Sequence, residues 1–220
     1  MKLLIKFPTR NRKEQFFSTF NKYQEFIVED TTKFSITIDE DDKTMNNDEV
    51  INEITSYVNT EVTIGNSVSK IDAINRDIDV NSDWDIILLA SDDMIPQIKG
   101  FDKIINTLMS TTYPDTDGIL FFNDGFQQDK LNTLCILGKK YYQRFGYIYQ
   151  PEYKSTWCDN EFMKVGNILK KQTYFPMTII KHEHPDWGYG KHDVIHNKNF
   201  KDLDFDRNLY YFREKNNFFL

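Results

Sequence analysis

The strongest constraint on the fold is a near-continuous apolar run, DIILLA, at residues 85–90. A strand covered by helices on both faces has such a run, whereas a strand with one face in water alternates apolar and polar residues. Two adjacent carboxylates, Asp92 and Asp93, follow the run directly. Neighbouring carboxylates repel each other unless a positive group lies close by. The stretch therefore predicts a buried strand that ends in two acids, whose charge a divalent cation, a basic side chain or solvent must compensate.

Strands and helices alternate along the first 124 residues. Short runs rich in β-branched residues predict the strands, and apolar residues at helical spacing predict the helices between them. This order is typical of an α/β fold with a mostly parallel central sheet flanked by helices. The expected strands are 2–7, ended by Pro8, then 34–39, 61–65, 85–90 and 118–124, and the expected helices are 13–27, 48–58, 67–78 and 101–109.

The pattern loosens after residue 124. Residues 134–153 are rich in aromatic side chains, residues 158–171 have helical character, and a histidine-rich segment leads into a polar, aromatic C-terminus. Neither a repeat nor a low-complexity linker divides the chain. We therefore expect one domain over residues 1–220, with a nucleotide-binding sheet in 1–124 and a differently built second half in 125–220.

Composition excludes several classes of protein. A formal charge of −7 and a pI near 5.2 provide no overall attraction to nucleic acid. No apolar run approaches the ~18 residues that span a bilayer, and MKLLIKFP is too short for a signal sequence. Cys135 and Cys158 lack the CxxC spacing of metal or redox sites and read as ordinary reduced thiols. A soluble, cytoplasmic protein is the expectation.

Polar residues follow three of the expected strands. Thr9 and Arg10 come after the first strand, Asp39 ends the second, and Asp92 and Asp93 follow the buried run. Ligands of mostly parallel sheets bind outside the carboxyl ends of the strands. The sequence therefore predicts that these residues belong to one binding site.

Five short motifs carry a resemblance to a known family: FPTRNR at 7–12, IDEDD at 38–42, SKIDAINRDI at 69–78, LASDDMIP at 89–96 and WCDNEF at 157–162. In this order they resemble the motifs of GT-A fold glycosyltransferases, particularly the family 2-like group that uses nucleotide-sugar donors. The resemblance covers most of the chain, although each motif is short.

The resemblance implies a donor site in the first half of the chain. A carboxylate at Asp39 would meet the uracil or ribose, and acceptance of a hydrogen bond from the uracil imide would favour a UDP-sugar. The residues themselves leave two alternatives open, a surface ion pair of Arg10 with Asp39 and a solvent-facing Lys70. The donor-binding residues implied are Pro8, Thr9, Arg10, Asp39, Lys70, Asn75 and Ser91.

The LASDDMIP motif matches the metal-binding Asp-x-Asp loop of the family, with one departure. Ala90 stands where the family has its first aspartate, which puts contacts to the ribose in doubt. Asp92 and Asp93 would hold Mn²⁺ or Mg²⁺, which neutralises the leaving diphosphate. Family members often add a C-terminal histidine to the metal, so His182 or His184 would complete the set. The alternative is a solvated turn in which Asp93 caps the following segment.

The WCDNEF motif resembles the acidic segment that supplies the catalytic base. In inverting transfer this base deprotonates the acceptor hydroxyl as it attacks the anomeric carbon. Asp159 is the first candidate and Glu161 the second, and Trp157 could stack on a sugar ring or belong to the core. A carboxylate that only caps the helix after it is the alternative.

Three other functions stay open. A nucleotidyltransferase could use a similar sheet, but residues 7–14 lack the glycines of its phosphate loop. A non-catalytic nucleotide-sugar binder would also explain the missing first aspartate. The histidines at 182, 184, 192 and 196 could serve a His-x-His zinc hydrolase, or form a solvated loop. The acceptor, whether glycan, protein or modified nucleic acid, is not readable from the residues.

Overall fold

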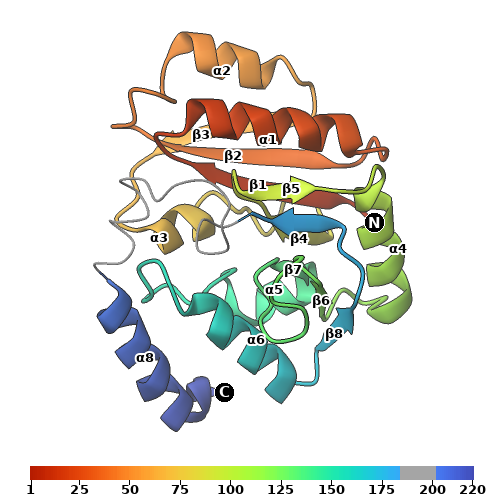
Figure 1. Cartoon of the computed structure of the whole chain (residues 1–220), viewed down its shortest axis with the longest axis vertical. Helices are drawn as coiled ribbons and strands as arrows, with labels where there is room; N and C mark the ends of the chain where they lie inside the picture. The colour runs from red at the N-terminus through yellow and green to blue at the C-terminus, as the bar shows by residue number, and fades with distance from the viewer. Residues whose placement is uncertain (184–201) are drawn as a thin grey trace.

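A computed structural model of the chain describes residues 1–183 and 202–220. A mixed sheet forms its centre (Figure 1). The strands of this sheet are β1 (Leu3–Thr9), β2 (Lys33–Asp39), β3 (Thr60–Gly65), β4 (Ile86–Leu89), β6 (Ile119–Phe122), β7 (Ile136–Gly138) and β8 (Gln172–Phe175). Their order across the sheet is β3-β2-β1-β4-β7-β6-β8. β7 runs antiparallel to both neighbours, and the other strands share one direction. The expected mostly parallel α/β fold is confirmed.

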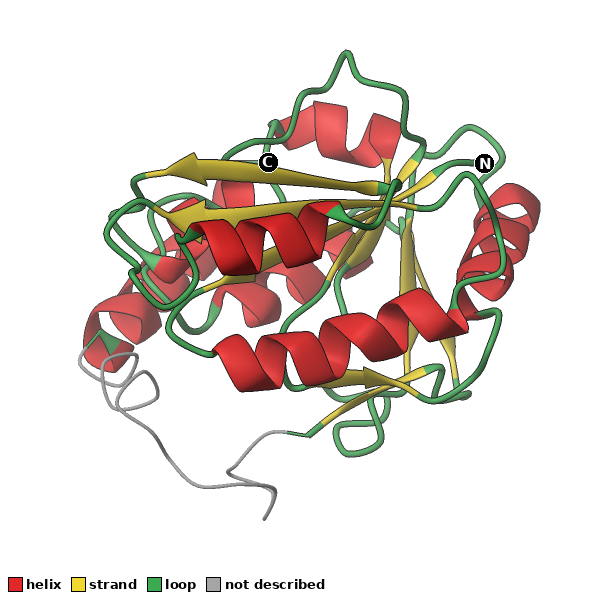
Figure 2. Ribbon diagram, turned by 90° about the horizontal axis from the view of Figure 1, so that it is seen from above, coloured by secondary structure: helices red, strands yellow, loops and turns green. Residues whose placement is uncertain are grey.

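Helices cover both faces of the sheet, which Figure 2 shows from above. In Figure 1, α1 and α2 lie at the top, whereas α5, α6 and α8 gather in the lower half. The helices are α1 (Lys13–Phe26), α2 (Asp48–Thr55), α3 (Lys70–Asn75), α4 (Phe101–Thr112), α5 (Lys139–Phe145), α6 (Cys158–Ile168) and α8 (Leu203–Lys215), followed by the 3-10 turn η2 (Asn217–Phe219). No helix of the described residues is both long and apolar enough to cross a membrane.

The apolar run of β4 separates two cores. Ile86 and Leu88 face a cluster that includes side chains of α1, α2 and α4. Ile87 and Leu89 face the opposite cluster, built with α3, α5 and α6. Successive side chains of a strand point to opposite faces, so every residue of β4 is buried, and the strand is apolar throughout for that reason.

Most element boundaries differ from the sequence expectation by one to three residues, and two of these differences have a local reason. β1 continues through Pro8 to Thr9. The backbone carbonyls of Lys2 and Lys6 accept hydrogen bonds from the β4 side, and the pairing of β1 with β4 ends at Lys6. Pro8, which has no N–H, therefore lies beyond the last paired residue on that side. The third helix, α3, is shorter than expected because Ser69 caps its start: the Ser69 Oγ accepts a hydrogen bond from the Asp72 N–H at 3.1 Å.

The second half of the chain contains most of the elements that the pattern did not predict. Three of the additional strands are only three residues long, too short for a periodicity to show. Besides β7, these are β5 (Met94–Pro96) and β9 (Ile180–His182), which form a separate antiparallel pair. The predicted helix 158–171 ends at Ile168 and is followed by β8.

Helix α8 is fastened to the chain before α6 by a buried carboxylate. Asp206 is fully buried, and its oxygens accept the backbone N–H groups of Lys154, Ser155 and Thr156 at 2.8–2.9 Å. Three N–H groups on one carboxylate satisfy donors that the fold would otherwise bury without partners. The C-terminal helix thereby sets the position of the segment that leads into α6.

Candidate functional site

The carboxyl end of β4 delivers two aspartates to the edge of the sheet, as the sequence predicts. Asp93 accepts a hydrogen bond from the Ser91 hydroxyl, and its carboxylate lies 3.4 Å from Nε2 of His182. His182 stands on β9, which pairs with β5 so that Met94 lies opposite His182. The short β5–β9 ladder therefore brings a histidine from the second half of the chain to the acidic pair.

Asp92 is held by α1 through both its side chain and its backbone. Its Oδ1 lies 2.9 Å from a guanidinium nitrogen of Arg12, and its carbonyl accepts a hydrogen bond from the Thr19 hydroxyl at 2.7 Å. Arg12 directly precedes α1, and Thr19 lies in its second turn. The Arg12 and Asp92 side chains are only 15% and 12% exposed. The sequence did not predict this contact, because no local pattern distinguishes Arg12 from an arginine on the surface.

The environment separates the pKa values of the two aspartates. Burial raises the pKa of Asp92, and the charge of Asp93 adds to the effect, although Arg12 opposes it. Burial acts in the same direction on Asp93, but the hydrogen bonds from His182 and Ser91 outweigh it and hold the pKa of Asp93 below its ordinary value. Asp93 is therefore an anion at neutral pH, the form that coordinates a cation.

These side chains fit a divalent cation that takes part of its shell from elsewhere. Carboxylate oxygens and an imidazole nitrogen are suitable donors for Mn²⁺ or Mg²⁺. Within residues 1–183 and 202–220, no group of three His, Cys, Asp or Glu side chains could hold an ion unaided. Mg²⁺ is commonly held by one or two carboxylates together with substrate phosphates and water. The donor set therefore suits a metal that binds together with a diphosphate.

A second group of charges lies at the ends of β1 and β2. The Asp39 carboxylate is buried between two arginines, 2.6 Å from Arg10 and 3.4 Å from Arg76. Arg10 also forms two hydrogen bonds with Asp41, at 2.7 and 2.8 Å. The ion pair of Arg10 with Asp39, which was the alternative to a nucleoside contact, is present; Arg10 is 35% exposed and Asp39 is 9% exposed. A carboxylate has about four lone-pair positions, so Asp39 retains acceptor capacity for a ligand.

Thr9 lies at the carboxyl end of β1, the strand that precedes Arg10. Its hydroxyl is buried and has no hydrogen-bond partner among the described residues. A buried hydroxyl without a partner is unfavourable by about 1–3 kcal/mol. Pro8, beside it, has neither an N–H nor a polar side-chain atom and contributes shape alone. Thr9 is therefore available to a ligand at this edge of the sheet.

Beneath this edge lies a lysine that the pattern did not mark as special. Lys6 is fully buried, and its ammonium donates to the Thr37 hydroxyl and to the Arg76 carbonyl, the latter at 2.8 Å. Burial lowers the pKa of Lys6 to about 8, although the nearby Asp77 opposes the shift. Lys6 thereby connects β1 to the end of α3 and fixes the residue that contacts Asp39.

Lys70 connects the aspartates of β4 with the start of α6. Its side chain is exposed at the first position of α3, as in the solvent-facing alternative to the implied donor contact. Burial acts to raise the pKa values of Asp92, Asp93 and Asp159, and the charge of Lys70 acts in the opposite direction on all three. Burial outweighs it at Asp92 and Asp159, whose pKa values are raised overall. A single ammonium group acts on all three carboxylates, and these therefore lie around one region.

Asp159 stands in the first turn of α6, and its Oδ1 accepts the N–H of Asn160 at 2.9 Å. Burial raises the pKa of Asp159, whereas this hydrogen bond, Lys70 and His182 lower it less strongly. A carboxyl group whose pKa is raised toward neutrality holds a proton more readily than an ordinary aspartate. Asp159 therefore holds a proton more readily than an ordinary aspartate, and the charges of Lys70 and His182 act on it.

Glu161 has a different role from the catalytic one expected from the sequence. It is 4% exposed, and both carboxylate oxygens accept hydrogen bonds from Arg213 of α8 at 2.8–3.1 Å. The Tyr153 hydroxyl donates to it as well, at 2.8 Å. These contacts occupy the carboxylate in a buried ion pair between α6 and α8. We therefore correct the expectation: Glu161 supports α6, and Asp159 is the remaining candidate.

Asn75 also has a structural role in place of the expected donor contact. Its amide donates to the Tyr149 carbonyl at 2.6 Å, and its Oδ1 accepts the N–H groups of Ile148 and Tyr149. The side chain thus holds a loop of the second half against α3.

We expect Asn75→Ala to lower the free energy of unfolding by about 1–3 kcal/mol, because partly buried backbone groups would lose their partners. Chemical denaturation measures the change. Asn66→Ala is the matched control, because Asn66 makes an exposed contact with Glu40, and its effect should stay within about 0.5 kcal/mol. Equal effects of the two substitutions would contradict the structural role.

The structure also shows the positions of Trp157 and of the two cysteines. Trp157 packs against Tyr210 and Tyr211 of α8, with ring centroids 5.2 and 5.6 Å apart, so it belongs to the core contacts of that helix. Cys135 and Cys158 are buried free thiols, and burial raises the pKa of both. They match the expectation of ordinary reduced cysteines. His184, His192 and His196 lie outside the described residues.

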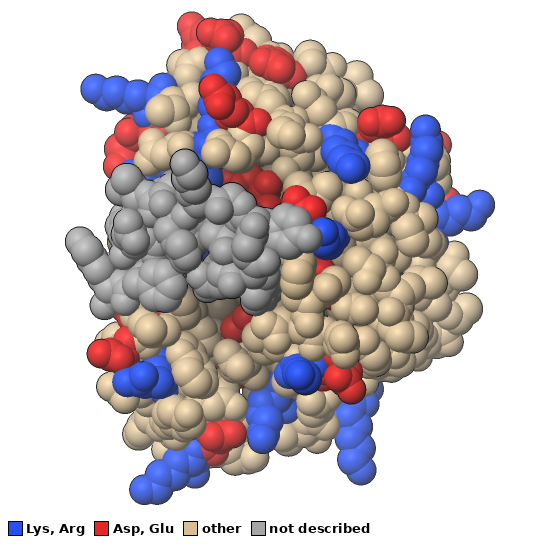
Figure 3. Space-filling view, in the orientation of Figure 1, with Lys and Arg blue, Asp and Glu red and all other residues tan. Residues whose placement is uncertain are grey.

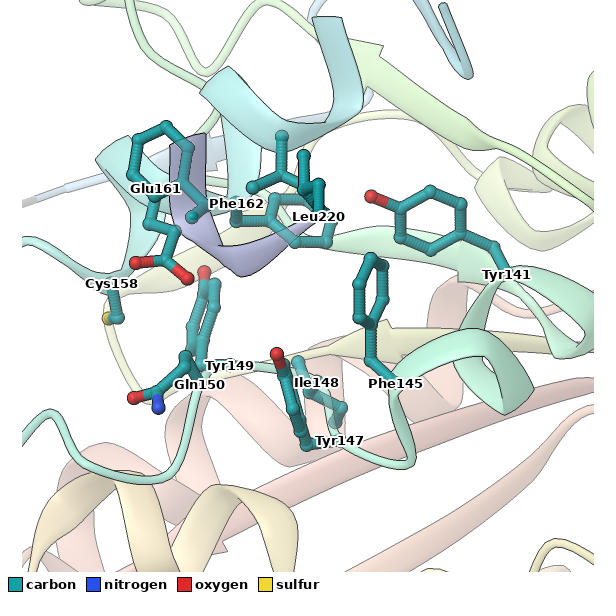
Figure 4. Close-up of a pocket in the computed structure, with 12 residues that line it drawn as sticks. Tyr141, Phe145, Tyr147, Ile148, Tyr149, Gln150, Cys158, Glu161, Phe162 and Leu220 are labelled. Atoms are coloured by element: carbon teal, nitrogen blue, oxygen red, sulfur yellow. The ribbon is translucent and has the colours of Figure 1, made fainter. Parts of the chain in front are cut away.

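Two further features bear on ligand binding: the distribution of charge on the surface and a pocket in the second half of the chain. Figure 3 shows basic and acidic side chains interspersed on this face, with acidic atoms set into a recess beside the undescribed residues. Figure 4 shows a pocket of the second half into which aromatic rings project, including Phe145, Tyr147 and Phe162. None of the described residues that line this pocket is a Lys or Arg, and a diphosphate site requires positive charge.

Comparison with known proteins supports the fold. Neither a protein-family profile nor a curated protein matches the sequence. Among solved structures, the mannosyltransferase PcManGT from Pyrobaculum calidifontis, in complex with GDP-Man and Mn²⁺, matches with a TM-score of 0.67 at 11% identity over 86% of this chain. S. aureus TarS 1–349 in complex with UDP-GlcNAc matches with a TM-score of 0.63 at 13% identity over 82%.

The chain spans 58% of the length of the PcManGT chain and 57% of that of TarS 1–349. At such low identity the likeness concerns the backbone arrangement. The chain therefore has the GT-A-like fold of these glycosyltransferases.

Proposed function

We propose that this chain is a metal-dependent glycosyltransferase that moves a sugar from a nucleotide diphosphate to an acceptor hydroxyl with inversion. One observation carries the proposal: two aspartates, a histidine and a lysine gather at the carboxyl edge of the sheet, together with a carboxyl group whose pKa is raised. The solved structures with this fold that bind GDP-Man, UDP or UDP-GlcNAc support it.

The nucleoside would bind at the ends of β1 and β2. The Thr9 hydroxyl has no described partner, and the Asp39 carboxylate is held in place by Arg10 and Arg76. An acceptor in this position suits the imide N–H of uracil, and we therefore propose UDP as the nucleotide. Cytosine has no N–H at that ring position and would lose this hydrogen bond.

The diphosphate would bind next to Asp92 and Asp93. Mn²⁺ or Mg²⁺ would take ligands from Asp92, Asp93 and His182 together with the diphosphate itself, and would supply charge neutralisation for the leaving group. His184, the other histidine that the family resemblance suggests, remains a proposal. Lys70 adds a positive charge from α3, as its effect on the pKa values of both aspartates indicates. Ser91 orients Asp93 through its hydrogen bond.

Asp159 would accept the proton of the acceptor hydroxyl. Its position at the start of α6 is maintained by the contacts of α8 with the preceding residues. Proximity and orientation of acceptor and donor, together with charge stabilisation, would provide most of the rate acceleration. We propose that this hydroxyl belongs to a glycan, a protein or a modified nucleic acid.

Calorimetric titration of UDP with Mn²⁺, and again with EDTA, tests the donor site. We expect UDP to bind at least about tenfold more tightly with the metal, because the metal joins the diphosphate to the aspartates. GDP, CDP and ADP serve as comparisons and should bind more weakly. If no nucleotide binds with or without metal, the proposal is wrong. If UDP binds, UDP-sugars are then screened for hydrolysis.

A further inference from the structure

We propose that the exposed face of α8 is a self-association surface, on which two copies of this chain pair their α8 helices in antiparallel orientation around Phe205, Phe212 and Phe219. The inference goes beyond the proposed transfer activity and does not depend on it. Three features of α8 carry it: aromatic rings exposed along one face, a turn that enlarges this face, and charges placed to meet a second α8 of opposite direction.

The first feature is the spacing of the rings. Phe205, Phe212 and Phe219 are seven residues apart and are 51%, 58% and 61% exposed. Positions seven apart in a helix lie on nearly the same face, with a drift of about 20°. The buried side of α8 carries Asp206 and Arg213, which contact α6 and the residues before it. Figure 1 shows α8 at the outer edge of the molecule, and its aromatic face is left uncovered.

The second feature is the turn after α8. Asn217, Phe218 and Phe219 have φ values of 50°, 54° and 60°, which non-glycine residues adopt at a cost. This backbone buries Phe218 to 3% exposure. It also sets the ring of Phe219 against that of Phe212, with centroids 6.0 Å apart. The strained turn therefore adds a second exposed ring beside Phe212.

The third feature is charge. Asp204, whose side chain is 80% exposed, and the exposed Lys215 are eleven residues apart, or about three helical turns, and so lie on the same flank of the aromatic face. In two antiparallel helices related by a two-fold axis, equal flanks meet in opposite directions. Asp204 of one copy then lies beside Lys215 of the other. The same alignment places Phe205 of one copy opposite Phe212 and Phe219 of the other, so charges and rings agree on one register.

The size of the face suits a weak dimer. A phenylalanine buries about 150–250 Å² when it is fully covered, so three rings more than half exposed present roughly 300 Å² on each copy. Two copies would therefore cover about 600 Å² of aromatic surface, half of the ~1,200 Å² at the lower end of specific interfaces. The flanking residues of a helix about 20 Å long would supply the rest. We expect a dissociation constant in the micromolar range.

Charge also favours a second copy over a lipid surface. The exposed charged residues of α8 and its first cap are two acids, Asp202 and Asp204, and two bases, Arg207 and Lys215. Helices that lie on a bilayer surface carry an excess of lysine and arginine on their polar face. The balanced charge of α8 lacks this excess and suits a partner with the same balance.

Sedimentation velocity of the full chain, at concentrations of about 1 to 100 µM around the expected constant, tests the association. The mass should rise with concentration from 26.2 kDa toward twice that value. Phe212→Ser should weaken the association about tenfold or more, because a central exposed aromatic ring contributes most to such a contact. Val58→Ser is the matched control: Val58 is 105% exposed and lies outside this face, so its replacement should change nothing.

A charge reversal tests the register and uses only surface positions, so it does not depend on how well Phe212→Ser folds. Lys215→Glu and Asp204→Lys should each weaken the association about three- to tenfold, because like charges would then meet across the contact. The combined variant should return to within about twofold of the unmodified chain, because the pair is restored in reverse.

A mass of 26.2 kDa at every concentration overturns the proposal. Association that Phe212→Ser leaves unchanged places the contact elsewhere and overturns it too, and a combined charge variant weaker than either single one overturns the antiparallel register. Co-sedimentation with phosphatidylcholine–phosphatidylserine vesicles tests the other occupant. Vesicle binding that Phe212→Ser abolishes, in a chain that stays monomeric, would identify a lipid surface in place of a second copy.

Discussion

Replacing Arg213 by methionine should lower the free energy of unfolding by about 3–5 kcal/mol, the usual effect of removing one partner from a buried ion pair. The guanidinium makes three hydrogen bonds of 2.8–3.1 Å to Glu161, and without it the glutamate would be buried with Tyr153 as its remaining described donor. Urea denaturation monitored by circular dichroism measures the loss.

Two further variants make this result specific to the ion pair. Arg213→Met combined with Glu161→Gln should recover part of the lost stability, because the uncompensated charge is then gone. Lys164→Met removes an exposed pair with Glu214 at 3.6 Å and should change the free energy of unfolding by less than about 1 kcal/mol. A loss for Arg213→Met no larger than that for Lys164→Met would contradict the structural role of Glu161.

Replacing Asp159 by asparagine should reduce sugar transfer by about 10²- to 10⁴-fold, the contribution of a positioned general base. UDP affinity with Mn²⁺ should stay within about twofold, because asparagine keeps the size of the side chain and can accept the Asn160 N–H in the same way. Radiolabelled transfer and calorimetry measure the two effects. Asp204→Asn, at an exposed position on α8, is the control and should change neither.

The raised pKa of Asp159 has two consequences with defined signs. Only the ionised carboxylate accepts a proton, so transfer should rise with pH through the raised pKa and then level off. The folded chain also holds this proton more tightly than the unfolded chain does. The free energy of unfolding therefore falls as pH rises between the ordinary and the raised pKa, and Asp159→Asn should lack this fall.

Retained transfer in Asp159→Asn would favour another base, and transfer absent from the unmodified chain would favour the non-catalytic nucleotide-sugar binder.

The sequence predicted what depends on local pattern. The DIILLA run, buried on both faces, and the aspartates after it follow from strand periodicity and from the rule that ligands bind at the carboxyl edge of such sheets. By contrast, the insertion of β7 between β4 and β6 rests on three residues, and no periodicity reveals the partner of so short a strand.

The residues that the sequence could not assign are defined by distant partners. Arg12 and Asp92 are 80 positions apart, and Glu161 and Arg213 are 52 positions apart. A carboxylate near a helix start has the same local pattern whether it accepts a substrate proton or a buried arginine. The structure distinguishes the two residues because Glu161 accepts hydrogen bonds from Arg213 of α8, whereas Asp159 accepts the N–H of Asn160.

The contact between α6 and α8 also orders events during protein synthesis. The residues of the acidic edge, from Thr9 to Asp93, leave the ribosome early and complete the strands that surround β1 before the second half exists. The partners of Glu161 and of the backbone at 154–156, which are Arg213 and Asp206, are synthesised later. A nascent chain can therefore pair β1 with β2 and β4 before the residues that hold its proposed base in position are synthesised.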